Sequence, residues 1–219
     1  THYESTLKTK VVSIASYSQT ELAISVFGDR FWIFNKLNGE LRPMPVNDPE
    51  LNYQVKYAGV GINICNENDG KLLIFGRTLY RYDRTTGLCR RIKIDSGTKS
   101  IGYFLSIGNT DKGLWFHDNR KLYFLPTGAE DLTTVSVFSS NEIIRCGHID
   151  QKGDIWLATS DGLHRFDTTN RSFHKIPTSL FNDAVSVVCD KNARVWVGTK
   201  YGLFAYLSKS DTFAMFGKS

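Results

Sequence analysis

Short apolar runs separated by polar turns recur along the chain. The run Ile155–Thr159 holds β-branched, aromatic and apolar residues without helical spacing, which predicts a β-strand. Asp161 and Gly162 follow it and predict a tight turn, because glycine carries no Cβ and adopts positive backbone angles easily. Leu163–Phe166 then predicts a returning strand and Phe173–Ile176 a third, more polar one. Such a meander cannot bury its apolar faces alone.

This pattern returns with a period of about forty residues. Trp115, Trp156 and Trp196 lie 41 and 40 residues apart, and Leu73 takes the tryptophan position 42 residues before Trp115. A first copy lies 50 residues further back, and we expect its extra length to form a long loop over residues 43–57. Each copy also opens with another predicted strand: Val11–Tyr17, Gly59–Cys65, Ile101–Ile107, Ile143–Ile149 and Val185–Cys189.

Four strands in about forty residues are typical of a propeller blade, since each flat blade needs neighbours on both faces. The sequence therefore predicts an all-β fold, a β-propeller of five four-stranded antiparallel blades that is part of a larger propeller array. One segment, residues 1–219, would hold blades at 8–57, 58–98, 99–140, 141–181 and 182–219. We expect an incomplete arc, whose uncovered end blades favour a homodimer. Because the chain begins with Thr1, we also expect a portion of a longer protein.

Two copies of one motif carry a family resemblance. Asp190 to Leu203 reads Asp-x-x-x-x-Val-Trp-Val-Gly-Thr-x-x-Gly-Leu, and Asp150 to Leu163 follows the same pattern with Trp156 at its centre. These stretches resemble the two-component regulator propeller repeat. The third blade keeps Gly-Leu-Trp, the second has leucine for tryptophan, and the first is the most degenerate.

The resemblance implies the periplasmic sensor region of a hybrid histidine kinase/response regulator from a glycan-degrading bacterium. It implies a non-catalytic segment that recognises an oligosaccharide and signals to a histidine kinase in the same protein, with other domains of that sensor as partners. Its motif is structural and assigns no chemistry. Two alternatives stay open: a propeller enzyme like the streptogramin lyases, which need a clustered His/Glu metal site, and a scaffold for protein partners. Fold alone does not separate them.

The composition and the charge of the chain limit the classes of molecule that it is expected to bind. Of the 219 residues, 41% are hydrophobic and 22% charged, as in globular proteins, and no apolar run reaches the length of a membrane span. The net charge is +5, but no basic run extends beyond Arg90, Arg91 and Lys93, which argues against nucleic acid. An acidic oligosaccharide would be the natural anionic partner in the periplasm. The simpler explanation, which we favour, is a surplus of charge that serves solubility.

The sequence holds no recognised catalytic or metal motif. The five histidines lack metal-ligand spacing, and the acid pairs Glu67 with Asp69 and Asp150 with Asp154 are expected to be solvated. We therefore predict no catalytic residue, no metal and no cofactor. Features that recur in several blades are read as scaffold: Asn35, Asp83 and Asp167 as turn caps, Trp115, Trp156 and Trp196 as interblade core, and Cys65, Cys146 and Cys189 as thiols on inner strands, with no disulfide expected at these or at Cys89. Trp32 does not recur and is the candidate for exposure.

Binding is expected where the repeat does not dictate the residue. In a propeller, the turn between the second and third strands lies at the same end of the blade as the connection to the next blade. Arginine forks bind carboxylates and aromatic rings stack on sugars. That face would also hold Asp161, Tyr53 and Tyr57 on the long loop, and the loop at Phe181 and Asn182. The predicted ligand contacts on it are Arg30, Arg77, Arg120, Lys200 and Tyr201. The competing interpretation is that this face docks a neighbouring domain.

Overall fold

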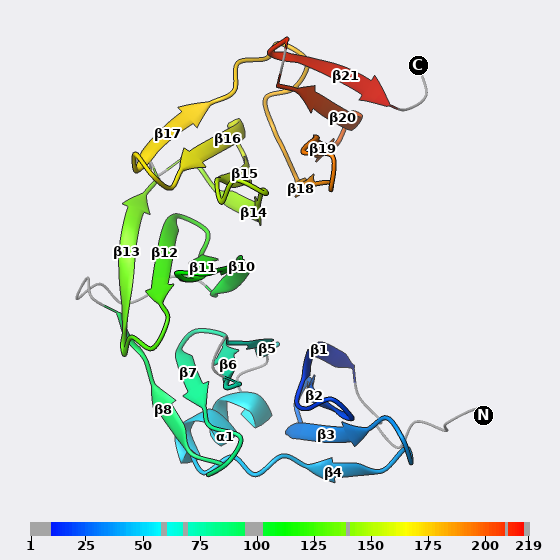
Figure 1. The fold of residues 1–219 in the computed structure, drawn as a ribbon, viewed down its shortest axis with the longest axis vertical. Helices are drawn as coiled ribbons and strands as arrows, with labels where there is room; N and C mark the ends of the chain where they lie inside the picture. The colour runs from blue at the N-terminus through cyan, green and yellow to red at the C-terminus, as the bar shows by residue number, and fades with distance from the viewer. Residues whose placement is uncertain are drawn as a thin grey trace. The chain divides into compact units, whose positions relative to one another are not determined.

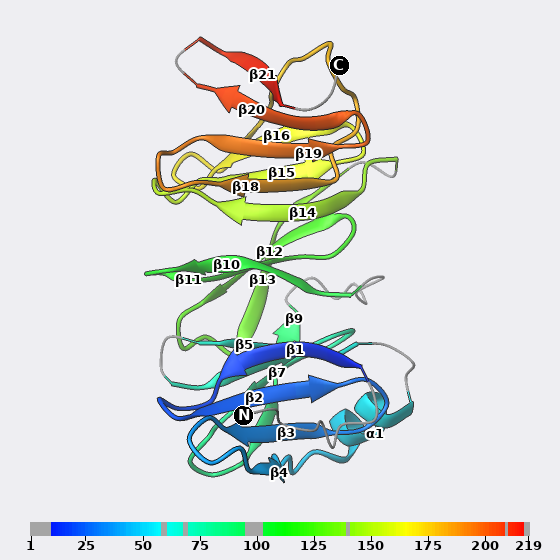
Figure 2. The same cartoon turned by 90° about the vertical axis from the view of Figure 1, so that its right-hand side faces the viewer.

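A computed structural model describes residues 10–57, 61–67, 70–94, 103–138, 141–208 and 210–216. The chain forms two compact units. The first comprises Thr1–Leu105 with Thr127–Leu132, and the second comprises Ser106–Pro126 with Thr133–Ser219. Strands dominate both units (Figures 1 and 2). The all-β prediction is confirmed: the described residues form five antiparallel meanders of four strands each.

The first unit contains two of these sheets. Their first strands lie side by side, where the Ser13 hydroxyl donates to the Ile64 carbonyl at 3.1 Å and accepts from the Ile64 amide at 3.2 Å. The core between them includes Ile33, Leu72 and Tyr80, each at most 1% exposed. The strands are β1 (Val11–Ser16), β2 (Glu21–Val26), β3 (Phe31–Asn35) and β4 (Leu41–Pro43), then β5 (Asn63–Asn66), β6 (Leu72–Phe75), β7 (Leu79–Tyr82) and β8 (Cys89–Arg91). A short strand that the sequence did not predict, β9 (Lys93–Ile94), runs parallel to Asp131 and Leu132.

The second unit contains most of the other three sheets; β9, Leu105 and the first two residues of β13 belong to the first unit. The first strands of the last two are again neighbours, and the Cys189 amide donates to Nδ1 of His148 at 3.3 Å. The strands are β10 (Leu105–Thr110), β11 (Gly113–His117), β12 (Lys121–Pro126) and β13 (Asp131–Val137), then β14 (Ile144–Ile149), β15 (Ile155–Thr159), β16 (Gly162–Asp167) and β17 (Ser172–Lys175), then β18 (Ser186–Cys189), β19 (Val195–Thr199), β20 (Gly202–Leu207) and β21 (Thr212–Phe216).

The motif that repeats at Asp150 and Asp190 forms a hydrogen-bonded turn. Each carboxylate accepts two backbone amides of the turn after the first strand, and its Oδ2 accepts the indole N–H of the tryptophan six residues later, at 2.9 Å for Trp156 and 3.0 Å for Trp196. These bonds hold the pKa of the Asp190 carboxyl well below its usual range. The repeated motif therefore builds the same hydrogen-bonded turn in both sheets, which is the structural role that the sequence predicted for it.

The later turn of the meander is capped as expected. One side-chain oxygen of Asp167 accepts the amides of Thr169 and Asn170, both at 2.9 Å, and Asp83 accepts two amides in the same way. Asn35 does so in the first sheet. The amide donors lower the pKa of Asp83 and Asp167, because they favour the ionised carboxylate. The turn-cap prediction is confirmed at all three positions.

The tryptophan prediction is confirmed for Trp156 and Trp115, which are buried, and is wrong for Trp196. Trp156 packs against Tyr206 of the following sheet, with ring centroids 5.5 Å apart. Trp196 is half-buried, and its described ring partner is Phe216 of its own sheet, with ring centroids 5.0 Å apart. Trp32 is also half-buried, and its indole donates to Asp29 at 2.9 Å.

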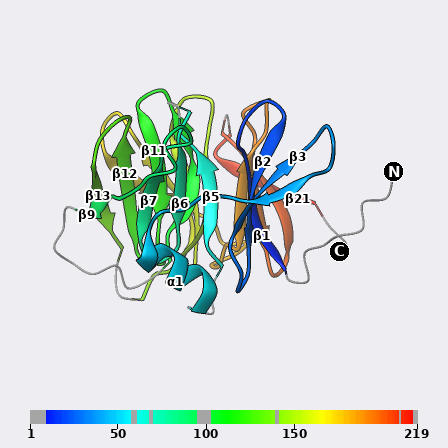
Figure 3. The same ribbon diagram turned by 90° about the horizontal axis from the view of Figure 1, so that it is seen from below.

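The predicted loop over residues 43–57 is wrong in its second half, which forms α1 (Pro49–Tyr57). Asp48 caps the helix: its Oδ1 accepts the Leu51 amide at 2.7 Å, and proline at the first helical position needs no amide partner. Leu51 and Val55, four residues apart, bury one helical face at 1% and 3% exposure. The helix lies beside the β5–β8 sheet (Figure 3).

Two carboxylates expected in solvent are instead buried and paired. Glu67, 4% exposed, forms a bidentate pair with Arg81 at 2.6 and 2.7 Å, and Asp154, 6% exposed, pairs with Arg165. A buried carboxylate needs such a partner, because desolvation of an unpaired charge is costly. Asp69 lies outside the described residues. No disulfide joins the four cysteines, all of which lie in described segments, and Cys65, Cys146 and Cys189 lie on first strands as predicted.

Candidate functional site

The turns that carry the predicted ligand contacts lie beside the interblade connections, as the sequence predicted. In the first unit the Phe104 amide donates to the Gly76 carbonyl at 2.9 Å. In the second unit Ile144 donates to Asn119 at 2.8 Å, and Ala184 donates to Thr159 at 2.9 Å. Within each unit, hairpin turns and connections therefore share one end of the sheets.

The first unit carries Arg30 and Arg77 at this end, both exposed. Arg77 is held by Tyr103: its Nε donates to the phenol oxygen at 2.8 Å, and the guanidinium lies 5.3 Å from the ring centroid. Arg30 lies 3.4 Å from Asp29 and 5.8 Å from the centroid of Trp32. Both guanidinium groups are thus placed against aromatic rings at the surface.

The second unit carries the other three predicted contacts, all exposed. Arg120 lies on the β11–β12 turn, while Lys200 and Tyr201 lie on the β19–β20 turn, with the ammonium 4.9 Å from the phenol ring. Tyr201 is 55% exposed. In the described part of this unit, no hydrogen bond or ion pair joins Arg120 to the other two, so the structure places them on separate hairpins.

Two aromatic features of the predicted face differ from expectation. Tyr53 and Tyr57 lie on α1 rather than on a loop; they are 64% and 61% exposed, with ring centroids 5.1 Å apart. Phe181 is 4% exposed and packs between Phe204 and Phe213, so it offers no surface to a ligand. An apolar ring in the interblade connection serves the core.

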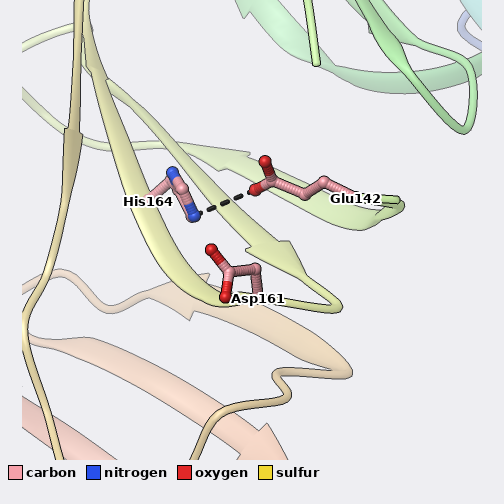
Figure 4. A group of neighbouring side chains, drawn as sticks. All are labelled: Glu142, Asp161 and His164. Carbon is pink, nitrogen blue, oxygen red and sulfur yellow. Dashed lines mark ion pairs between the residues drawn. The ribbon is translucent and has the colours of Figure 1, made fainter. Parts of the chain in front are cut away.

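A cluster that the sequence search missed lies at the same end of the second unit. Glu142 comes from the connection before β14, Asp161 from the β15–β16 turn and His164 from β16 (Figure 4). Their three ligand atoms all lie within 4.8 Å of one another, and Nε2 of His164 is 3.0 Å from Oε1 of Glu142. The search failed because the 19-residue gap from Glu142 to Asp161 spans a whole hairpin, which no short metal motif covers.

The surroundings of the cluster fix its electrostatics. His164 is 8% exposed and meets the ring of Phe138 edge-on, with centroids 6.0 Å apart. Burial lowers the pKa of the imidazole, although the carboxylates of Glu142 and Asp161 act in the opposite direction. Nζ of Lys175 lies 2.6 Å from Oδ2 of Asp161, so this lysine pairs with one of the two carboxylates.

A cavity of about 430 Å³ lies at the opposite end of the second unit. It is formed between the sheets of β10–β13 and β14–β17, at the turns that precede β11, β15 and β17. Trp115 and Phe124 form its apolar wall, and the buried Thr134 hydroxyl in it has no hydrogen-bond partner among the described residues. Its rim carries exposed Lys112, Lys152 and Arg171. The aromatic wall, the hydroxyls and the cations of this cavity could contact a saccharide, as the exposed side chains of the predicted binding face could.

Comparison with solved structures decides the fold. The chain superposes on the extracellular domain of BT4673 from B. thetaiotaomicron, described as a hybrid two-component system, with a TM-score of 0.71, 16% identity and 94% of this chain covered. It matches the extracellular domain of BT3049, described in the same terms and from the same organism, with a TM-score of 0.67, 17% identity and 99% coverage. This chain is a β-propeller segment. The fold that the sequence resemblance implied is confirmed.

The propeller segment spans 28% and 31% of those two chains. A streptogramin B lyase structure also matches, with a TM-score of 0.70, 8% identity and coverage of 97% of this chain and 70% of the lyase. No protein-family model and no curated protein matches the sequence. Among the described residues, no helix has the length and apolar character to cross a membrane.

Proposed function

We propose that this propeller segment is the extracytoplasmic, periplasmic sensor part of a hybrid two-component regulator, which recognises an oligosaccharide and transmits its binding to a histidine kinase. The observation that carries the proposal is the match over 94–99% of the chain to extracellular domains of such systems. The motif at Asp150 and Asp190 points to the same class from the sequence. The segment itself performs no catalysis; it offers surfaces on a rigid scaffold.

The proposed ligand contacts are Arg30, Arg77, Arg120, Lys200 and Tyr201. Support comes from their exposure, from the aromatic rings beside Arg30 and Arg77, and from the net charge of +5. A guanidinium donates two parallel hydrogen bonds to a carboxylate or sulfate, while an exposed tyrosine stacks on a sugar ring. An acidic oligosaccharide fits this set best.

The test is a thermal-shift screen of the chain against acidic and neutral oligosaccharides, followed by variants of each end of the second unit. Because a ligand that binds the folded state raises the melting temperature, we expect stabilisation by an acidic oligosaccharide. Arg120→Ala should abolish that shift and leave the melting temperature without ligand unchanged. In the full-length sensor, Arg77→Ala together with Arg120→Ala should abolish the signalling response to the same sugar.

Lys152→Ala is the matched control, because Lys152 is an equally exposed cation on the rim of the opposite cavity. If the shift is lost with Lys152→Ala and retained with Arg120→Ala, the binding site lies in the cavity rather than on the proposed face. If no oligosaccharide stabilises the chain and the full-length sensor does not respond to any, the oligosaccharide proposal is wrong.

A lyase remains the second candidate, favoured by the streptogramin B lyase match and by the His164 cluster. It predicts turnover of a streptogramin B substrate by the chain, detected as a new product by mass spectrometry. The sensor proposal predicts no turnover.

A further inference from the structure

We propose that Glu142, Asp161 and His164 form a binding site for one divalent transition-metal ion of the Zn²⁺ type. The proposal goes beyond the sensor function and does not rest on it. Its starting observation is that one imidazole nitrogen and two carboxylate oxygens, drawn from a connection, a hairpin turn and a strand, lie close together (Figure 4). A mixed nitrogen and oxygen set suits zinc, whereas magnesium and calcium prefer oxygen alone.

The separations are close to those a metal requires. Zinc bonds of about 2.1 Å in tetrahedral geometry place neighbouring ligand atoms about 3.4 Å apart. Here Nε2 of His164 and Oε1 of Glu142 are 3.0 Å apart, and none of the three ligand atoms is more than 4.8 Å from another. Asp161 is exposed on the β15–β16 turn, so its side chain has room to rotate toward the other two ligands.

The histidine supplies an independent observation. Nε2 of His164 is buried and, among the described residues, has no hydrogen-bond partner; Oε1 of Glu142 lies 3.0 Å away as an ion-pair contact, which carries charge on both sides only when the imidazole is protonated. A buried polar nitrogen without a partner is costly, and a cation between it and the carboxylate would satisfy both. Burial also favours the neutral imidazole, which is the form that binds metal.

The repeat shows that this histidine is an exception. His164 pairs with Leu157 across β15 and β16. At the same register position three of the other four sheets place Tyr80, Tyr123 and Phe204, each at most 2% exposed. The repeat therefore places an aromatic ring with apolar faces at this position, and the β14–β17 sheet has the imidazole of His164 there instead.

Neighbouring groups complete the site. The Thr159 hydroxyl lies 3.1 Å from Oε1 of Glu142 and donates to it, which orients the carboxylate as outer-shell partners of metal ligands do. Lys175, half-exposed, occupies Oδ2 of Asp161 and would compete with the metal for it. Three protein ligands leave a fourth position for water or for an anionic group of a bound molecule.

The experiment is isothermal titration of the chain with Zn²⁺ after removal of bound metal with a chelator and dialysis. We expect one site with the two carboxylates and His164 as ligands. His164→Ala, Glu142→Gln and Asp161→Asn should each weaken binding at least about tenfold, the loss that even an outer-shell change causes. The cysteine thiols are competing zinc ligands, so the titration is repeated with a variant in which all four cysteines are replaced by alanine, and the site should persist.

Two further variants make the test specific. His174→Ala removes an exposed histidine of the same sheet and should leave the affinity unchanged. Lys175→Met removes the competing cation and should tighten binding. If the chain binds no zinc, or if Glu142→Gln and Asp161→Asn bind as the wild type does, the proposal is wrong; these two substitutions nearly preserve side-chain shape, so a folding defect in His164→Ala does not obscure the result.

Discussion

Replacing Trp156 by alanine tests the packing between neighbouring sheets. Trp156 is 4% exposed, its ring faces Tyr206 of the following sheet at 5.5 Å, and its indole N–H donates to Asp150 at 2.9 Å. Removing a buried tryptophan leaves a cavity that the sheets fill incompletely, and such substitutions cost about 3–5 kcal/mol of the free energy of unfolding. We expect Trp156→Ala to fall in this range.

Two further substitutions separate the contributions. Trp156→Phe keeps most of the ring and removes the N–H, and Asp150 still accepts the amides of Lys152 and Asp154, so we expect a loss of about 1 kcal/mol from the hydrogen bond. Trp196→Ala removes the same hydrogen bond at the same position of the repeat, but Trp196 is half-buried. Its cost should be clearly smaller than that of Trp156→Ala.

Urea denaturation followed by circular dichroism measures these differences as shifts of the midpoint at constant slope. Equal losses for Trp156→Ala and Trp196→Ala would show that burial by the next sheet contributes nothing. A Trp156→Ala protein as stable as the wild type would refute the assignment of Trp156 to the interblade core.

Two other predictions concern local sterics and thiol chemistry. Gly113→Ala should lower the urea midpoint far more than Gly128→Ala. Both glycines have positive φ angles, of 150° and 77°, but a Cβ on Gly113 would collide with the Leu125 carbonyl, while a Cβ on Gly128 would meet no described atom within 4 Å. Similar losses in the two variants would contradict this reasoning. Burial raises the pKa of the Cys89 and Cys189 thiols to about 12, so at pH 8 both should stay protonated and react with iodoacetamide more slowly than a cysteine in a short model peptide. Peptide mapping by mass spectrometry measures the reaction rates. A rate equal to that of the model peptide would show that the thiols are not desolvated.

The fold was predictable because its determinants repeat. Each blade shows the same alternation of apolar runs and turn residues, so five weak signals reinforce one another, and the caps at Asn35, Asp83 and Asp167 follow from local hydrogen bonding alone. The helix α1 occurs once and was taken for a loop. Its signals were nevertheless present: Asp48 before Pro49, and Leu51 and Val55 four residues apart.

Burial was harder to predict because it depends on what lies beside a residue. Trp156 and Trp196 occupy equivalent positions of the repeat, and each donates to an aspartate six residues earlier, yet they differ in exposure; Tyr206 packs against Trp156. Glu67 and Asp154 illustrate the same limit: each was expected in solvent, and each meets an arginine on a strand 14 and 11 residues later. Whether each carboxylate meets its arginine depends on the pairing register of the strands.

The residues of the candidate site differ in the same way: positions on exposed turns were predictable from the sequence, and a buried position on a strand was not. The positions of Arg77 and Arg120 on exposed turns were predictable from the sequence, because topology alone fixes the end of the sheet at which a hairpin turn lies; their role in binding stays a prediction. His164 was overlooked because only short metal-ligand spacings were considered, whereas Glu142 lies 22 residues before it in the sequence. Once the register aligns it with Tyr80 and Tyr123, it stands out as the polar exception at a core position. In a repeat protein, a departure from the repeat therefore carries as much functional information in the core as on the turns, but it becomes visible only after the strands are paired.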